Sequence, residues 1–102
     1  MNKVSIVIPM YYEEEVAREC YNRLKKVLDG LKNYQNEIIF VNDGSKDKTL
    51  EILTEIAKEN TNVKVISFAR NFGHQAAVAA GLKFVTGDVI LIIDADLQDP
   101  PE

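Results

Sequence analysis

The sequence predicts an α/β protein with a Rossmann-like parallel sheet, and three observations carry this prediction. Four short, β-branched, apolar runs occur along the chain, and a stretch with helical spacing of apolar residues separates each run from the next. The runs are almost continuously apolar, which is typical of strands covered on both faces. Polar residues and turn formers follow each run. The order β-α-β-α-β-α-β favours right-handed crossovers, and we expect the strand order 3-2-1-4.

Each element can be placed from its pattern. The strands are expected at residues 4–8, 38–41, 63–68 and 89–93. The helices are expected at residues 13–31, from an N-cap at Asp47 through residue 57, and at residues 74–85. In the first helix, acidic residues crowd the start and basic residues lie near the end, which matches the helix dipole.

Composition limits the class of protein. The chain has 102 residues, of which 46% are hydrophobic and 27% charged, as in one small globular domain. The net charge of -4 argues against broad binding to nucleic acid or to anionic membranes. The single cysteine, Cys20, falls among apolar residues of the first helix, where a buried hydrophobe is expected. No signal-peptide pattern begins the sequence, and we expect a cytoplasmic protein.

The informative residues are those that follow the strands, because ligands of open parallel sheets bind at the carboxyl ends of the strands. Most of these residues are acidic, aromatic or amide-bearing, one is basic, and the others are proline or glycine. They are Pro9, Tyr11, Glu13, Asn42, Asp43, Gly44, Arg70, Asn71, Gly73, Asp94, Asp96, Gln98 and Asp99. The sequence therefore predicts a ligand site at this edge of the sheet.

The strongest motif at this edge follows the fourth strand. If the chain stays extended there, Asp94, Asp96 and Gln98 point the same way. Two carboxylates and an amide oxygen are hard ligands that suit Mg²⁺ or Mn²⁺, and few protein ligands leave positions open for phosphate oxygens. The alternative is a solvated turn in which the aspartates serve as caps.

The other polar residues suit recognition of a nucleotide. Asp43 could accept a hydrogen bond from a nucleobase N–H, and the ring of Tyr11 could pack on the base. Glu13 could accept hydrogen bonds from ribose hydroxyls, or it could be an acidic residue at the start of a helix without a role in binding. Arg70 could pair with Asp43 or Asp94, or hold a phosphate.

Other functional classes lack their signatures. The sequence contains no G-x-x-x-x-G-K-[ST], no G-x-G-x-x-G after the first strand and no nucleophile elbow. These absences argue against a P-loop NTPase, a dinucleotide-dependent dehydrogenase and an α/β-hydrolase. The single histidine, His74, stands near a helix start, where a solvated residue is a better interpretation than a catalytic one.

With these residues in hand, the sequence resembles glycosyltransferase family 2, whose fold is of the GT-A type. The resemblance covers the whole chain and is especially close to the branch that glycosylates polyprenyl phosphates, which includes bactoprenol glucosyltransferases and dolichyl-phosphate mannose synthases. The segments that carry it are residues 7–13 (VIPMYYE), 41–45 (VNDGS), 70–75 (RNFGHQ) and 94–102 (DADLQDPPE). The sequence departs from the family at Tyr12, where asparagine usually stands.

The resemblance implies a role for each matched residue. Pro9, Tyr11, Glu13 and Asp43 match positions that hold the nucleoside, usually uridine. Asp94 matches the acid near the ribose and diphosphate, and Asp96 and Gln98 match ligands of Mg²⁺ or Mn²⁺. We expect Asp94 and Asp96 to be the catalytic residues, and Arg70 to join the nucleotide-sugar site.

The implied reaction is the inverting transfer of a sugar from a nucleotide-diphosphate sugar, with UDP as the expected nucleotide, to a polyprenyl phosphate. Residues 1–102 would form the nucleotide-sugar-binding part, without the acceptor half and any membrane helices, so the chain alone is expected to be inactive. The full-length protein would act at the cytoplasmic face of the membrane. Self-association through the exposed edge of the fourth strand is also expected.

Two other classes stay open from the sequence. The first is a nucleotide-binding module or fragment without activity. The second is a receiver-type signalling domain, which is disfavoured because no acidic pair follows the first strand.

Overall fold

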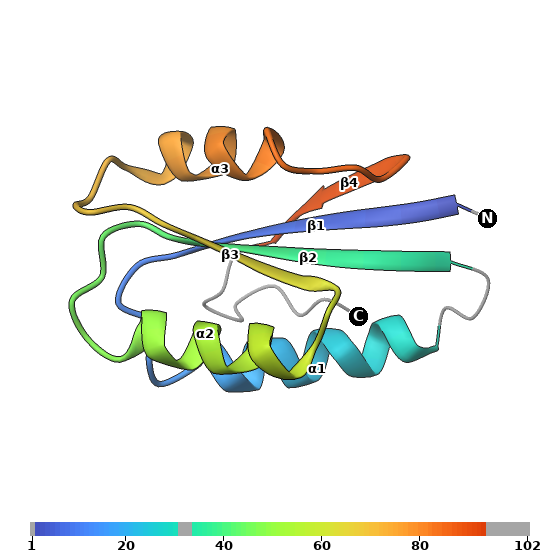
Figure 1. Cartoon of the computed structure of the whole chain (residues 1–102), viewed down its shortest axis with the longest axis horizontal. Coiled ribbons are helices and arrows are strands. Elements are labelled where there is room, and N and C mark those ends of the chain that lie inside the picture. Colours follow the sequence, from blue (N-terminus) through green and yellow to red (C-terminus); the bar gives the residue numbers. More distant parts are fainter. Residues whose placement is uncertain (1, 31–33, 94–102) are drawn as a thin grey trace.

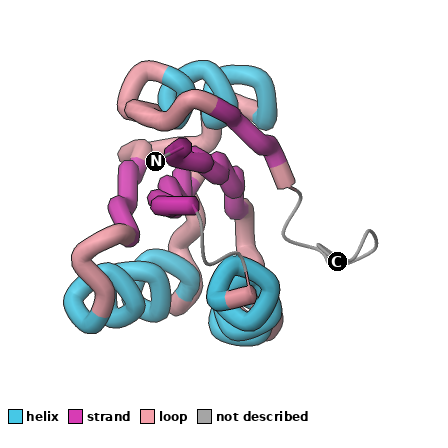
Figure 2. Tube along the Cα trace, turned by 90° about the vertical axis from the view of Figure 1, so that its right-hand side faces the viewer, coloured by secondary structure: helices cyan, strands magenta, loops and turns pink. Residues whose placement is uncertain are grey.

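The protein forms a parallel sheet between two layers of helices (Figure 1). The computed structural model describes residues 2–30 and 34–93. The strands are β1 (Asn2–Met10), β2 (Tyr34–Asn42), β3 (Val63–Ser67) and β4 (Val89–Ile92). The helices are α1 (Ala17–Asp29), α2 (Thr49–Glu59) and α3 (His74–Leu82). Helices α1 and α2 cover one face of the sheet and α3 covers the other (Figure 2).

The sheet has the predicted topology. Its strand order is β3-β2-β1-β4, and every neighbouring pair is parallel. The central pair is the longest, because β1 and β2 match over their whole length from Asn2–Tyr34 to Met10–Asn42. The prediction of a four-stranded parallel sheet in the order 3-2-1-4 is therefore confirmed.

The ends of several strands and helices differ from the predicted ranges. Strands β1 and β2 extend beyond their apolar runs, because polar residues at their starts also pair with each other in the sheet. Helix α1 begins at Ala17 instead of residue 13, after turns in which Glu13 accepts the backbone N–H groups of Val16 and Ala17. Helix α3 ends at Leu82, short of the expected residue 85. Apolar periodicity marks the buried part of an element and not its hydrogen-bonded ends.

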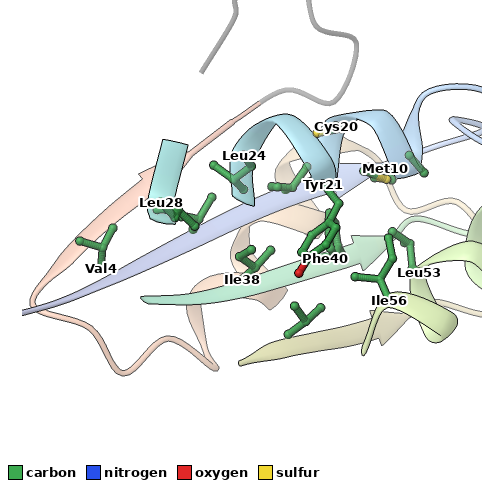
Figure 3. Packing of buried hydrophobic residues seen from close by; sticks show 14 residues of the cluster. Val4, Met10, Cys20, Tyr21, Leu24, Leu28, Ile38, Phe40, Leu53 and Ile56 are labelled. Atoms are coloured by element: carbon green, nitrogen blue, oxygen red, sulfur yellow. The ribbon is translucent and has the colours of Figure 1, made fainter. Parts of the chain in front are cut away.

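The larger part of the core lies between the sheet and the pair α1–α2 (Figure 3). Alternate residues of β1 and β2 face this layer, as the period of a strand requires. The fully buried members include Ile6, Ile8, Ile38, Phe40, Leu53 and Ile56. On the α3 face, Val7, Ile39, Val41 and Ala77 form a smaller cluster. Both faces of β1 and β2 are thus covered, which explains their continuous apolar sequence.

A buried carboxylate joins the strands at the end of the sheet opposite the predicted site. Glu37 of β2 is only 3% exposed. Its Oε2 atom accepts hydrogen bonds from Ser5 Oγ at 2.5 Å, from the Thr86 backbone N–H at 2.6 Å and from Thr86 Oγ1 at 3.0 Å. Its Oε1 atom lies 3.4 Å from Lys64 Nζ and 3.7 Å from Lys3 Nζ. Contacts from β1, β3 and the segment before β4 therefore meet on one side chain of β2.

A close backbone approach completes this cluster. The Gly87 backbone N–H donates to Ser5 Oγ at 2.8 Å. A Cβ atom at residue 87 would lie 2.5 Å from the same Ser5 oxygen, so only glycine allows the chain to pass here.

The contacts of Glu37 also set its proton affinity. Burial raises the pKa of the Glu37 carboxyl, but the hydrogen bonds from Ser5, Thr86 and Lys64 outweigh burial and lower the pKa from 4.5 to about 2. A depressed pKa in the folded state means that the charged carboxylate stabilises the fold. This contribution is complete above the pKa of the unfolded chain and is lost as the pH falls from about 4.5 towards 2.

Replacement of Glu37 by glutamine tests this cluster. Glu37→Gln should lower the free energy of unfolding by about 1–3 kcal/mol at pH 7, because two lysines lose an anionic partner and the amide offers one acceptor oxygen where the carboxylate offers two. The deficit should shrink between pH 4.5 and 2, where the unsubstituted chain also loses the charge. Urea denaturation across this pH range measures both effects.

The matched control is Glu59→Gln on the surface of α2. Glu59 Oε2 lies 3.6 Å from Arg18 NH1, and the Glu59 side chain is 66% exposed. Because exposed ion pairs contribute little, we expect a change below about 0.5 kcal/mol. Equal effects of the two substitutions would remove the special role of Glu37.

Strand β4 is an exposed apolar edge of the described sheet. It pairs with β1 on one side, and all four of its residues are 44% to 50% exposed. The nearby Phe84 is 54% exposed. Apolar strand edges of this kind pair readily with other chains.

The chain by itself should therefore self-associate through β4 in a concentration-dependent way. Leu91→Lys places a charge on the edge strand and should shift the sedimentation profile towards the monomer. Phe84→Lys removes a similar exposed apolar side chain outside the strands and serves as the control. A monomeric unsubstituted chain at high micromolar concentration, or an equal shift with both variants, would contradict this expectation.

Candidate functional site

The carboxyl ends of three strands leave the sheet side by side. In the sheet register, Met10 is the partner of Asn42, and Asn42 is the partner of Ser67. The pairing continues one step further, because the Asp43 N–H donates to the Met10 carbonyl at 2.8 Å and the Phe68 N–H donates to the Asn42 carbonyl at 2.9 Å. The loops that carry the predicted site residues therefore start from adjacent points.

Two tyrosines stand directly after β1. Tyr11 and Tyr12 are 49% and 47% exposed, and their rings meet edge-to-face with centroids 4.7 Å apart. Tyr12 has a φ of 55°, in the left-handed region that asparagine tolerates better than a bulky residue. This conformation gives a physical reason for the asparagine that the resembling family usually has at this point. In this chain, the Tyr12 N–H donates to Ser45 Oγ at 2.8 Å.

The next residues tie the first loop to the start of α2. The Glu13 backbone N–H donates to Thr49 Oγ1 at 3.0 Å, and the Thr49 backbone N–H donates to Asp47 Oδ1 at the same distance. The N-cap position of α2 is Lys48, one residue after the predicted Asp47, and Asp47 instead accepts the N–H of the first helical residue from just outside the helix. Burial raises the pKa of Asp47, but hydrogen bonds from the Thr49 side chain and backbone lower it below its ordinary value.

Asp43 is the most constrained acid of the edge. It is 3% exposed, and both carboxylate oxygens accept hydrogen bonds from the loop before α3. Oδ1 accepts the Phe72 backbone N–H at 2.8 Å. Oδ2 accepts the Gly73 N–H at 3.0 Å and the Asn71 side-chain Nδ2–H at 2.9 Å. The loops after β2 and β3 are therefore joined through this side chain.

The backbone at Gly44 allows this junction. Gly44 has a φ of 79°, and a Cβ atom there would overlap the backbone of Arg70 and Asn71. The guanidinium of Arg70 lies 4.7 Å from the centroid of the Phe72 ring. In the part of the chain that the structure describes, Arg70 therefore packs on an aromatic ring, and the pairing of Arg70 with Asp43 that the sequence left open does not form.

Substitution of Gly44 should separate the two loops. Gly44→Ala meets both a left-handed backbone and the Arg70 backbone, so we expect the free energy of unfolding to fall by about 1–3 kcal/mol. The amide resonances of residues 70–73 should shift more than those of the Glu37 cluster at the opposite end of the sheet. Heteronuclear NMR and thermal denaturation measure these outcomes, and an unperturbed loop would show that the close approach is not required.

The remaining two candidates, His74 and Cys20, lie on α3 and α1. His74 is exposed at the first position of α3. Cys20 is buried in α1, and burial, reinforced by the charge of Glu13, raises the pKa of its thiol to about 11. Cys20 is therefore an unreactive thiol at neutral pH, which agrees with its expected packing role.

The acidic motif lies outside the described residues. This applies to Asp94, Asp96, Gln98 and Asp99, whose predicted roles stay predictions. The last described residue, Ile93, donates its N–H to the Val7 carbonyl at 3.0 Å, so β4 runs parallel to β1 and leads to the same edge. Within residues 2–30 and 34–93, no three His, Cys, Asp or Glu side chains gather as a metal site.

The structure thus brings together three of the four predicted groups. Contacts join the loop of Tyr11 and Glu13 to the loop after Asp43, and that loop to the segment of Arg70. Sequence reasoning missed Thr49 altogether, and it placed Asn71 at this edge and Ser45 in a matched motif without predicting their contacts. Their side chains act between loops that are 28 to 36 positions apart, and no local pattern marks such contacts.

In the described ranges, no helix is both long and apolar enough to cross a membrane.

Solved structures with this fold define the class. S. aureus TarS residues 1-349 matches with a TM-score of 0.75 and 29% identity, over 92% of this chain and 27% of that protein. The same protein in complex with UDP gives a TM-score of 0.76. The mannosyltransferase PcManGT from Pyrobaculum calidifontis, in complex with GDP-Man and Mn²⁺, gives a TM-score of 0.80 at 21% identity and shares the fold. The fold is that of the nucleotide-binding half of a GT-A glycosyltransferase.

The sequence comparison places the chain in a family. The model of glycosyl transferase family 2 matches residues 5–102, and the chain therefore belongs to this family. It is 57% identical over 99 residues to the uncharacterized glycosyltransferase YkcC of Bacillus subtilis, covering 96% of this chain and 30% of that protein.

Other relatives carry more specific names. The prophage bactoprenol glucosyl transferase homolog of Escherichia coli is 46% identical over 98% of this chain and 32% of its own length. The bactoprenol glucosyl transferase of Shigella phage SfX is 45% identical with the same coverage. The chain spans about a third of the length of these curated relatives.

Proposed function

We propose that this chain binds a nucleotide-diphosphate sugar, with uridine as the nucleoside. The observation that carries the proposal is that the loops bearing Tyr11, Asp43 and Arg70 are joined by hydrogen bonds at one edge of a GT-A sheet. An exposed aromatic ring can stack on a base, and an exposed guanidinium can hold a phosphate. The similarity to TarS, which has been solved with UDP and with UDP-GlcNAc, supports this choice of donor.

The whole protein, in this proposal, is an inverting glycosyltransferase with a polyprenyl phosphate acceptor. The names of the bactoprenol glucosyl transferases support this acceptor class. A phosphate acceptor is already an anion and needs less help from a general base than a hydroxyl does. Because the acceptor is a membrane lipid, the reaction would take place at the cytoplasmic face of a membrane. Residues 1–102 would supply the donor side of the active site.

A divalent cation, Mg²⁺ or Mn²⁺, is proposed as cofactor. The donor set of Asp96 and Gln98 fits such a hard cation, because it offers oxygen ligands and leaves positions free. When bound, the ion supplies positive charge that stabilises the departing diphosphate. Asp94 is proposed to lie near the ribose and the diphosphate. Pro9 and Glu13 would complete the nucleoside site beside Tyr11 and Asp43.

This assignment predicts that two aspartates of the same motif differ. Asp96→Asn should weaken Mn²⁺-assisted binding of UDP by about tenfold or more, because a metal ligand loses its charge. Asp99→Asn removes the same charge three residues later and should change the affinity by less than about threefold. Isothermal titration calorimetry with UDP and Mn²⁺, repeated with EDTA, measures both.

Equal losses in Asp96→Asn and Asp99→Asn would remove Asp96 from the site. UDP affinity that is unchanged by EDTA would contradict the metal. The second candidate function, a nucleotide-binding module without activity, makes the same prediction for UDP. It is separated from the first by assaying transfer of a labelled sugar to undecaprenyl phosphate with the whole protein, where the absence of transfer would favour the module.

A further inference from the structure

The loop after β3 is fixed by one amide side chain whose two contacts fall on a single residue. Asn71 Nδ2 lies 2.9 Å from Asp43 Oδ2 and 3.3 Å from the Asp43 backbone oxygen. The same carboxylate accepts the backbone N–H groups of Phe72 and Gly73. The carboxylate of Asp43, which is 3% exposed, thus accepts hydrogen bonds from three N–H groups of this loop. We call the contacts of Asn71, Phe72 and Gly73 with Asp43 the loop latch.

The latch lies between Arg70 and the start of α3. Arg70 directly precedes it, and the Arg70 guanidinium packs over the Phe72 ring. Helix α3 directly follows it, beginning at His74. The Phe72 ring also contacts the Phe68 ring edge-to-face, with 5.4 Å between the centroids. The segment between the end of β3 and the start of α3 therefore folds back so that these two side chains pack together.

We propose that Asn71 is a positioning residue for nucleotide binding, acting through the loop latch on Arg70. This inference rests on the proposed function, because it takes Arg70 as a ligand of the diphosphate. The carboxylate of Asp43 fixes the positions of three N–H groups in residues 71–73. In this proposal, the fixed backbone of residues 71–73 also fixes the orientation of the neighbouring Arg70 guanidinium. Asp43 therefore contributes to the site through the loop as well as through any direct contact with the nucleoside.

The chemistry of the latch requires a donor at residue 71. Aspartate has nearly the same shape as asparagine but replaces the Nδ2 donor with an oxygen, which would face Asp43 Oδ2 across 2.9 Å. Two carboxylates at this distance cannot both stay ionised without repulsion, and they share a proton at low pH. Asn71→Asp therefore opens the latch at pH 8 and allows it to close near pH 5.

The experiment combines two measurements on the 102-residue chain. Hydrogen exchange followed by NMR reports whether the Phe72 and Gly73 amides are protected. Calorimetry with UDP and Mn²⁺ reports the affinity at pH 8 and pH 5. In Asn71→Asp we expect protection of both amides to fall at pH 8, together with a loss of affinity of about tenfold, and both to recover at pH 5 relative to the unsubstituted chain.

Two controls separate positioning from other effects. Gln75→Glu adds the same charge to α3 and leaves the hydrogen bonds to Asp43 intact, so its affinity relative to the unsubstituted chain should vary little between pH 8 and pH 5. Asn71→Ala removes the donor without adding a charge and should lower protection and affinity at both pH values. Urea denaturation of each variant shows whether the rest of the fold is retained.

The outcomes are distinct. Wild-type affinity in Asn71→Asp at pH 8, with protection of Phe72 and Gly73 lost, would overturn the positioning role. Unchanged protection at pH 8 would overturn the latch itself. If the unsubstituted chain fails to bind UDP, the proposed function fails and the positioning role with it, while amide exchange alone still shows whether Asn71 holds the loop.

Discussion

The parallel pairing of β1 with β2 is the constraint on which the rest of the structure depends. The two strands match over nine residues and are covered on both faces, so their register cannot slip without exposing the core. This register sets Ser5 beside Glu37 at one end. At the other end it sets Met10 beside Asn42, from which the loops of Tyr11 and Asp43 leave the sheet. The apolar packing of β1 and β2 in the middle of the molecule thus fixes the positions from which the loops of the candidate site start.

Strand β2 carries a buried acid near its start and another just beyond its end, and the two illustrate different uses of the same chemistry. Glu37 and Asp43 are each 3% exposed. Glu37 accepts a hydrogen bond from Ser5 and pairs with lysines of the neighbouring strands. It stabilises the end of the sheet opposite the candidate site. Asp43 draws its donors from a loop that follows another strand. A buried acid in a parallel sheet is therefore no sign of a ligand by itself, and its donors show which part of the chain it organises.

The elements of this fold were predictable because their signal is local. Apolar runs and helical spacing identify the strands, the helices and the edge where Tyr11, Asp43 and Arg70 emerge. The composition of Val89–Ile92 does not show that β4 is exposed, since it is as apolar as the buried runs. The exposed edge was expected from the place of the fourth strand in the predicted order 3-2-1-4. Glu37 and Thr49 were missed, because each makes its contacts with partners far along the chain. Asn71 was placed at the edge of the candidate site, but its contact with Asp43 was not predicted. The acidic motif from Asp94 onwards rests on sequence alone.

The late return of β4 to the sheet has a consequence for the order of folding. The contacts between β1 and β2 span about 32 positions and those between β2 and β3 about 25, whereas Lys3 meets Asp88 across 85 positions. Closing the longest loop costs the most chain entropy, so we expect β1, β2 and β3 to assemble before β4 docks. Under the roles proposed for Asp94 and Asp96, a bound nucleotide would slow the release of β4, so its effect would be seen first in the rate of unfolding.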